Sequence, residues 1–351
     1  MIVVPRTVHG NRTTAENELM TEHRVCIEIG GMPVLIRTGQ SGFAKMLRDR
    51  YGAFAGPPLE NLAPVAPGPH SQGPTHAAFE LEVELIPPGV VTDAEDVRVT
   101  AEGGRWVMER GDFHAEWDEK RGQGWVRQSA NPYSLDSVLR ILHSLILARE
   151  GGFLVHAASA IRKGQAFLFA GISGTGKTTM CRLAPPDVAI LTDEISYVRK
   201  GQNEYSAAKG QKSGSSNSRE EEPRVNRQTA GLHHEYKIQD SRRYEAFGTP
   251  FAGELALIGR NLRAPIAGLF LLAKGRENRV EDVSDSDAAR ALLQNILFFA
   301  TDAELVQRVF QSALDFLARV PVRRLVFAPH PQVWKGIGVG SEGLDSGLAF
   351  Q

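Results

Sequence analysis

Residues 167–179, which read F-L-F-A-G-I-S-G-T-G-K-T-T, constrain this chain more than any other stretch. The first four form an apolar run of strand length, and residues 171–178 fit the pattern G-x-x-x-x-G-K-[ST] at every defined position. Glycines allow a tight turn in which successive N–H groups converge on an anion, where side chains would block the approach. Residues 178–183 are compatible with a helix. The sequence therefore predicts a phosphate-binding loop (P-loop) between a strand and a helix.

The side chains of this loop suggest individual roles. Lys177 adds a mobile positive charge for the outer phosphates, and the Thr178 hydroxyl is placed to bind Mg²⁺, which prefers oxygen ligands. The helix start adds N–H groups and the positive end of a dipole. We therefore expect ATP and Mg²⁺ as ligands. The residues expected to bind the nucleotide are Gly171, Ser173, Gly174, Thr175, Gly176, Lys177, Thr178 and Thr179.

A pair of acids follows the loop. Residues 188–191 read as a short apolar strand that leads into Asp193 and Glu194. A carboxylate at the end of such a strand can hold or orient Mg²⁺ opposite Thr178. Asp193 is the candidate general base and Glu194 the candidate metal ligand, although the two roles can be exchanged. Glu254, after a glycine-bounded turn, is either a further metal ligand or an ordinary loop acid.

Three motifs in fixed order resemble the HPr kinase/phosphorylase family: L-V-H-A-A-S-A at 154–160, the P-loop, and A-I-L-T-D-E-I-S-Y-V at 189–198. The resemblance implies an α/β fold with a P-loop nucleotide-binding core of HPr kinase type. It also implies that His156 assists Asp193 as general base on a serine hydroxyl. The chain departs from that family at Ala157, Thr178 and Glu194, where the family has glycine, serine and aspartate. Other segments look like HPr kinase-related proteins of bacterial biosynthetic clusters.

Length and patterning predict two cores, since 351 residues with 42% hydrophobic content exceed what one small domain needs. We expect a flexible tail over 1–21 and a β-rich N-terminal domain over 22–130. A P-loop kinase-like domain should follow over 131–335, with a disordered insertion at 200–240 because that segment has almost no apolar residues. Residues 336–351 should form a second flexible tail.

Local patterns predict individual elements. Gly30-Gly31 between two apolar runs indicates a hairpin over 24–37, and helical spacing over 43–51 predicts a helix that covers it. The rest of the N-terminal domain reads as antiparallel sheet, in which Trp106, Trp117 and Trp125 serve packing. Further expected helices cover 133–150, 288–299 and 302–317. Further expected strands cover 153–161, 167–170, 265–272 and 324–327.

Composition excludes several classes of function. A formal net charge of -1 gives no basic field for nucleic acid or an anionic membrane. Cys26 and Cys181 stand apart and are expected to be buried thiols, while His143 should be structural and His233-His234 solvated. The chain shows no apolar run of membrane-spanning length and its start lacks the apolar core of a signal peptide, so we expect a cytoplasmic protein.

These features together predict an ATP-dependent kinase, a phosphotransferase that acts on a serine or other hydroxyl of a peptide or protein. Lys177, Asp193 and His156 are its candidate catalytic residues. Two alternatives remain open: a nucleotide-binding switch or ATPase that acts by binding a partner, and a small-molecule kinase. The oligomeric state also remains open.

Overall fold

The computed structural model describes residues 22–58, 79–87, 96–201, 244–251, 253 and 259–337. The chain divides into two compact units, one formed by residues 1–140 with 299–301 and the other by 141–298 with 302–351. Each unit has its own sheet. Residues 202–240 of the predicted insertion, the N-terminal tail over 1–21, residues 338–351 of the C-terminal tail, and Glu254 lie outside the described residues. His233 and His234 fall within the part of the insertion that is not described.

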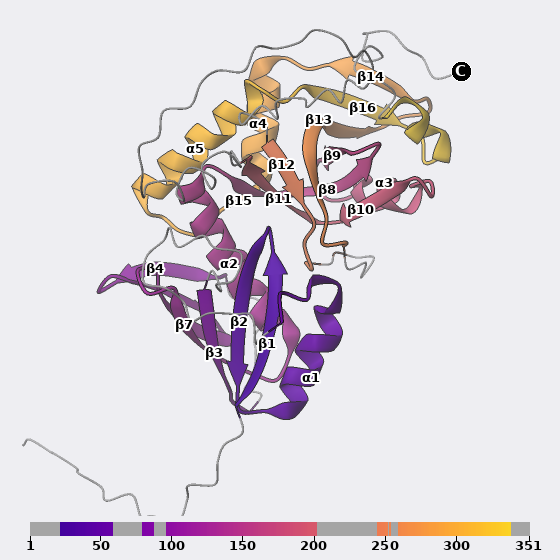
Figure 1. Cartoon of the computed structure of the whole chain (residues 1–351). Coiled ribbons are helices and arrows are strands. Elements are labelled where there is room, and N and C mark those ends of the chain that lie inside the picture. The colour runs from indigo at the N-terminus through magenta and orange to yellow at the C-terminus, as the bar shows by residue number, and fades with distance from the viewer. Residues whose placement is uncertain are drawn as a thin grey trace, which may run out of the picture. The chain divides into compact units, whose positions relative to one another are not determined.

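The first unit is built on a seven-stranded sheet (Figure 1). Its strand order is β1-β2-β3-β7-β6-β5-β4. Its elements are β1 (His23–Ile29), β2 (Met32–Thr38), α1 (Ser41–Arg50), η1 (Gly52–Phe54), β3 (Phe79–Leu85), β4 (Arg98–Glu102), β5 (Arg105–Arg110), β6 (Phe113–Asp118) and β7 (Gln123–Gln128).

Strand direction in this sheet differs from the prediction. The hairpin is confirmed, because β1 and β2 pair antiparallel around Gly30 and Gly31, whose φ angles are 64° and 75°. However, β3 runs parallel to both of its neighbours, β2 and β7, so the sheet is mixed and the antiparallel prediction is wrong there. Alternation of apolar residues shows which face of a strand is buried, but it contains no information on strand direction.

Packing in the first unit largely follows the pattern of the sequence. Phe43 and Leu47 of α1 are buried and the helix contacts β1, as expected. Trp106 and Trp117 are buried in the core, whereas Trp125 is half-buried and makes an edge contact with His114. Cys26 is also half-exposed, so the expectation of a buried thiol is wrong for this residue.

The second unit contains the predicted loop. The boundary between the units falls inside α2 (Pro132–Glu150). The remaining elements are β8 (Phe153–Arg162), β9 (Gln165–Ala170), α3 (Lys177–Arg182), β10 (Val188–Thr192), β11 (Ile195–Lys200), β12 (Tyr244–Phe247), β13 (Arg263–Lys274), β14 (Arg279–Asp282), α4 (Asp285–Asn295), β15 (Ile296–Leu297), α5 (Ala303–Leu317), β16 (Val322–Phe327) and η5 (Pro331–Gly336).

The sheet of the second unit is mixed and partly closed. Two long strands, β8 and β13, each pair with different partners along their length. The pairs β8–β11, β11–β12, β12–β13, β13–β9 and β9–β8 therefore form a closed ring of five strands. Three strands, β9, β13 and β16, are parallel and adjacent.

This arrangement overturns the predicted fold class. The expected α/β fold with a P-loop core of HPr kinase type is wrong, because the second unit is β-rich with a mixed sheet and few helices among its described residues. The physical reason lies in the connections. A short turn joins β8 to β9 as antiparallel neighbours, and such a turn needs no crossover helix. β10 and β11 follow one another along β8, both antiparallel to it, with only two residues between them.

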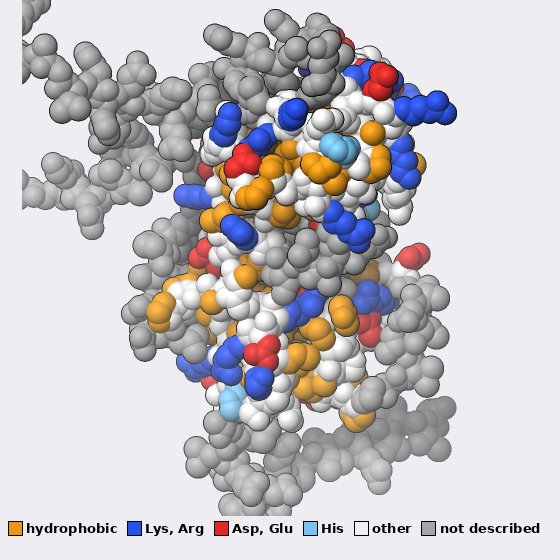
Figure 2. Space-filling view, turned by 90° about the vertical axis from the view of Figure 1, so that its right-hand side faces the viewer, with side chains coloured by type: hydrophobic (Ala, Val, Ile, Leu, Met, Phe, Trp, Pro, Cys, Tyr) orange, Lys and Arg blue, Asp and Glu red, His pale blue; other side chains and the backbone are white. Residues whose placement is uncertain are grey.

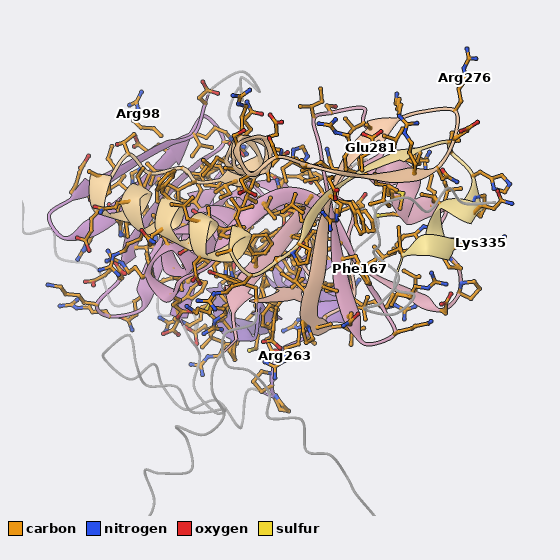
Figure 3. All side chains as sticks on the ribbon, turned by 90° about the horizontal axis from the view of Figure 1, so that it is seen from above. Arg98, Phe167, Arg263, Arg276, Glu281 and Lys335 are labelled. Carbon is orange, nitrogen blue, oxygen red and sulfur yellow. The ribbon has the colours of Figure 1, made fainter. Side chains whose placement is uncertain are left out.

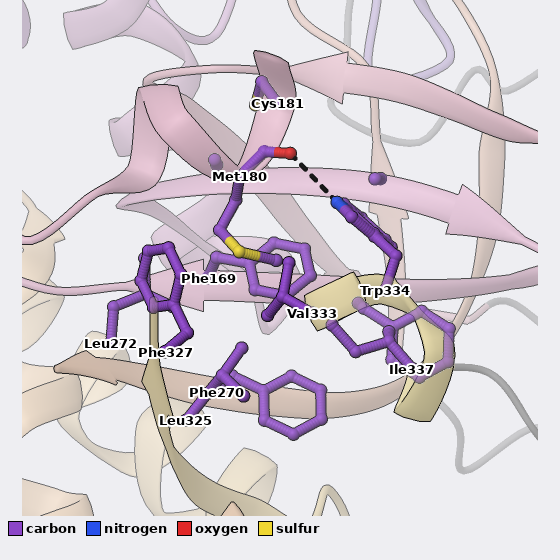
Figure 4. Close-up of a cluster of buried hydrophobic side chains, with 13 residues drawn as sticks. Phe169, Met180, Cys181, Phe270, Leu272, Leu325, Phe327, Val333, Trp334 and Ile337 are labelled. Atoms are coloured by element: carbon purple, nitrogen blue, oxygen red, sulfur yellow. Dashed lines mark hydrogen bonds between the residues drawn. The ribbon is translucent and has the colours of Figure 1, made fainter. Parts of the chain in front are cut away.

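Helices and the 3₁₀ segment η5 cover this sheet (Figure 1). α4 and α5 contact β8, and Phe316 of α5 makes an edge contact with Phe153. On another side, α3 and η5 contribute to a buried cluster with alternate residues of β8, β9, β13 and β16 (Figure 4). Within it the Trp334 indole packs edge-on against Phe169 and donates a hydrogen bond to the Met180 carbonyl at 3.1 Å. Trp334 thereby ties η5 to α3.

Several element boundaries also differ from the prediction. The helix expected over 288–299 ends at Asn295, because Ile296 and Leu297 form β15 and pair with β8. The helix over 302–317 is confirmed as α5. Ile337 is buried although the sequence placed it in a flexible tail. No helix among the described residues combines the length and apolar character needed to cross a membrane.

Candidate functional site

The predicted loop stands at one edge of the second unit's sheet. It follows β9, whose parallel neighbour β13 is in turn parallel to β16. The carboxyl ends of three adjacent parallel strands therefore meet at this edge. In sheets with parallel strands, ligands bind at the carboxyl ends.

Glycine conformation gives the loop its path. Gly174 and Gly176 have φ angles of 78° and 114°, values that other residues rarely adopt. A Cβ on Gly176 would lie 2.5 Å from Cζ of Phe327, the last residue of β16. No atom stands within 4 Å of the corresponding position on Gly174. The loop therefore rests on Phe327 at Gly176 and is open at Gly174.

Lys177 holds the loop from within. Its side chain is 8% exposed, and its ammonium Nζ donates to the carbonyl oxygens of Gly171 at 2.7 Å and Ile172 at 3.4 Å. The Thr175 amide and hydroxyl both donate to the Ile172 oxygen as well. A cation is thus fixed at the centre of the loop, where an anion would meet it.

The amides of the loop are the second group suited to an anion. Within the described part of the chain, the N–H groups of Gly174, Gly176 and Thr178 donate no hydrogen bond to another protein atom. The expected contribution of a helix dipole is small, because α3 has only six residues. An anion at this loop would therefore meet the loop amides and Lys177 rather than a helix dipole.

The two acids lie in the turn between β10 and β11. The Thr192 hydroxyl accepts the N–H groups of Glu194 at 3.2 Å and Ile195 at 3.3 Å, which bends the chain at this point. Asp193 is only 2% exposed, and its Oδ1 accepts the Gly253 N–H at 3.0 Å. Glu194 is half-buried. The turn therefore fixes one carboxylate in the interior beside a more accessible one.

Cys181 connects the acids to the loop helix. Its Sγ lies 3.9 Å from the Thr192 carbonyl oxygen, so α3 packs against the end of β10. Burial, with the nearby charge of Asp193 as a smaller cause, raises the pKa of the Cys181 thiol to about 12. The thiol is therefore protonated and unsuited to act as a nucleophile. Cys181 is buried as predicted, and its position brings α3 and Asp193 to the same edge.

His156 lies near the acids along the backbone. It is half-buried on β8 and is the register partner of Ile195, the residue after Glu194. The register therefore places His156 across from the start of β11, directly after the two acids, and Cys181 places α3, which begins at Lys177, against the residue before them. Thr178 and Thr179 are half-buried at the start of α3, and Ser173 is exposed.

The protein supplies only some of the ligands that a bound Mg²⁺ ion and nucleotide would need. Among the described residues, no cluster of three or more His, Cys, Asp or Glu side chains could hold a metal ion. A cation here would need phosphate oxygens in addition to Thr178 and a carboxylate, which is how Mg²⁺ commonly binds at nucleotide sites. The open space at Gly174 and the loop amides fit a phosphate group.

Two supporting residues escaped the sequence analysis. Phe327 packs beneath Gly176 and Gly253 hydrogen-bonds to Asp193, and both come from far along the chain. A Cβ on Gly253 would lie 3.0 Å from Glu194 Cβ and 3.2 Å from Asp193 Oδ2, so glycine is needed for this close approach. The glycine-bounded turn around residue 253 indicates a close approach of two segments, but nothing local indicates that the other segment carries Asp193.

The region around the loop is similar to a known protein family. A model of the family described as SynChlorMet cassette protein ScmC matches residues 130–226, a range that includes the loop and the acid pair. The match covers less than half of the chain, which is similar to that family over this region. No curated protein matches the chain significantly.

The match corrects the resemblance inferred from the sequence. The family found is not the HPr kinase/phosphorylase family or another P-loop kinase family, so that assignment is wrong. The three motifs that carried it describe local chemistry, which recurs on unrelated folds. The assisting role of His156 rested on that resemblance, and we assign it no step.

Proposed function

We propose that this chain binds Mg–ATP at residues 171–178 and transfers the terminal phosphoryl group to a hydroxyl of a peptide or protein. The observation that carries the proposal is that two buried side chains of opposite charge, Lys177 and Asp193, lie beyond the ends of strands in the same sheet. Lys177 is 8% exposed and Asp193 is 2% exposed, and backbone groups of two loops hold them. Burying a charge is costly, so such groups concentrate where chemistry requires them.

The proposed mechanism uses positioning and charge. The amides of Gly174, Gly176 and Thr178 and the ammonium of Lys177 bind the phosphates and stabilise the charge that develops on them. Thr178 and Glu194 would hold the magnesium ion, which neutralises phosphate charge when bound. Asp193, fixed by the Gly253 amide, accepts the proton of the attacking hydroxyl.

Asp193→Asn tests the transfer step. The substitution preserves the shape of the side chain and removes its basicity, so transfer should fall by about 10²–10⁴ while Mg–ATP affinity stays within a few-fold. Transfer would be followed by mass in a library of serine-containing peptides, together with phosphate release to water. Glu194→Gln is the control, and it should instead weaken the dependence of ATP affinity on Mg²⁺.

The outcomes separate the remaining alternatives. Unchanged transfer in Asp193→Asn would remove this residue from the mechanism. Phosphate release without transfer to any peptide would favour a nucleotide-dependent switch that acts by binding a partner. Transfer to a small hydroxyl compound but to no peptide would favour a small-molecule kinase.

A further inference from the structure

The P-loop follows β9, and the strands on the two sides of β9 end in chemically different residues. β9 has β8 on one side and β13 on the other. On the β8 side, β10 ends at Thr192 and is followed by Asp193 and Glu194. On the β13 side, β13 and β16 end at Lys274 and Phe327, which are register partners. The acids and the ends of these two strands therefore flank the loop on opposite sides.

A polar turn on the β13 side, residues 274–278, is held at a fixed position relative to the loop. The Gly275 amide donates to the Phe327 carbonyl at 3.0 Å, and the Ala328 amide donates to Oδ1 of Asn278 at 3.0 Å. Phe327 in turn packs beneath Gly176 of the loop. Two hydrogen bonds thus connect the turn to the backbone at the end of β16, and the buried Phe327 ring of that strand lies beneath the loop.

The side chains of this turn suit an aromatic, hydrogen-bonding ligand. Lys274, Arg276 and Glu277 are exposed, and Figure 3 shows Arg276 projecting into solvent. Oδ1 of half-buried Asn278 accepts the Ala328 N–H. The side-chain NH₂ group of Asn278 therefore points away from Ala328 and offers two hydrogen-bond donors.

We infer that residues 274–278 form the nucleoside subsite, an inference that rests on the proposed function. A triphosphate whose terminal group meets Asp193 and Glu194 must extend its nucleoside away from those acids, across the loop. The β13 side is then the sheet edge it reaches. There the planar guanidinium of Arg276 stacks on the base, and the Asn278 amide donates to a nucleoside acceptor.

The experiment compares two ligands that differ only in the nucleoside. Affinities for Mg–ATP and for Mg–tripolyphosphate would be measured by calorimetry for the parent, Arg276→Lys and Asn278→Ala. Arg276→Lys retains the positive charge and loses the plane, so it should weaken ATP by about tenfold and leave tripolyphosphate within about twofold. Asn278→Ala should likewise weaken the binding of ATP and leave the binding of tripolyphosphate nearly unchanged. Arg279→Lys, at an exposed arginine paired with Glu281, is the matched control and should change neither affinity.

The results separate a failure of the nucleoside subsite from a failure of the proposed function. If tripolyphosphate and ATP bind the parent equally well, the nucleoside contributes no affinity and this inference is wrong. If Arg276→Lys leaves ATP affinity unchanged, the nucleoside subsite is elsewhere. In both cases the loop assignment stands. If the parent binds neither ligand, the proposed function is wrong and this inference is wrong with it. Arg276 is exposed, so its substitution should not affect folding, and an unchanged melting temperature would verify that.

Discussion

Two regions of this protein, the outer face of the first unit's sheet and the loop edge of the second unit, hold their charged side chains in different ways. On the outer face of the first unit's sheet, charges pair with one another across strands, as Arg37 does with Glu80 at 2.8 Å and Arg105 with Glu116 at 3.2 Å. In the second unit, backbone groups hold the two central charges: Lys177 donates to loop carbonyls, and Asp193 accepts an amide.

The comparison shows that a high density of charge does not mark a site. Charged side chains are spread over the face of the molecule that Figure 2 shows. An open hollow of about 210 Å³ lies on the first unit's outer face, and its lining residues include both ion pairs. Exposed pairs of this kind contribute about 0–1 kcal/mol and leave little charge for a ligand. At the loop edge, by contrast, the lysine and the aspartate are buried and fixed by backbone groups. We therefore place the chemistry there.

The largest expected effect concerns the core beneath the loop. Trp334→Ala removes a side chain that is 1% exposed and the hydrogen bond to Met180, so it should destabilise the second unit by about 3–5 kcal/mol. Trp125→Ala is the counterpart on the first unit's outer face and should cost about 1 kcal/mol or less, since that ring is half-buried. Chemical denaturation, with hydrogen exchange as the readout for each unit, would measure the loss of stability in both variants. Equal losses would contradict the contrast between the units.

A smaller effect is expected at the loop glycines. Gly176→Ala should destabilise the second unit by about 2–3 kcal/mol, because strain at φ 114° adds to a contact with the buried Phe327 ring. Gly174→Ala has similar strain but meets no atom within 4 Å, so its cost should be about 1 kcal/mol. Thermal melts of the two variants test this. If Gly174→Ala is the more harmful, the loop does not rest on Phe327 in the way described.

The next prediction concerns pH and is confined to the second unit. Burial, with Arg199 as a smaller cause, lowers the pKa of His143 to about 3 from its ordinary value near 6.5. The unfolded chain binds this proton below about pH 6.5 and the folded chain does not. Stability should therefore be full above pH 6.5 and fall by up to about 1.4 kcal/mol per unit as the pH drops, or about 2 kcal/mol by pH 5.

Denaturant titrations at pH 7, 6 and 5 would measure this slope. His143→Leu removes the titrating group and should flatten it, even if the variant is less stable at neutral pH. A slope that persists unchanged in His143→Leu would assign the acid sensitivity to other groups.

The smallest expected effect is at an ion pair. Arg105→Ala removes an exposed pair on the first unit and should change stability by less than about 0.5 kcal/mol. Arg162→Ala is the matched change in the second unit, where the guanidinium donates to the carbonyls of Trp334 and Ile337 and pairs with Asp187. This loss should cost about 2 kcal/mol. Similar values for both variants would remove the proposed difference between the units.

Local features of the fold were predictable because they depend on neighbouring residues. Gly30-Gly31 specified a hairpin turn, and the spacing of apolar residues specified α5. The closed ring of strands was not predictable, because it arises where β8 and β13 each pair with partners far apart in sequence. The parallel direction of β3 was hidden for the same reason.

The candidate site shows the same limit. The motif identified Lys177 and the strand end identified Asp193, since each is marked by adjacent residues. Their supports, Phe327 beneath the loop and Gly253 on the carboxylate, are contacts between distant segments that no local pattern reveals. Glu254 lies outside the described residues, and its role stays a prediction.

The central claim, that the loop binds a phosphate group through Lys177, is tested most directly by the affinity of Lys177→Met for Mg–ATP. Methionine keeps an unbranched apolar stem in this nearly buried position and removes the ammonium group. We predict a loss of about ten- to hundred-fold, equivalent to about 1.5–3 kcal/mol for a charge-assisted contact. Lys335→Ala, at an exposed lysine of η5, should bind as the parent does. If Lys177→Met binds Mg–ATP as tightly as the parent, the loop is not the phosphate site.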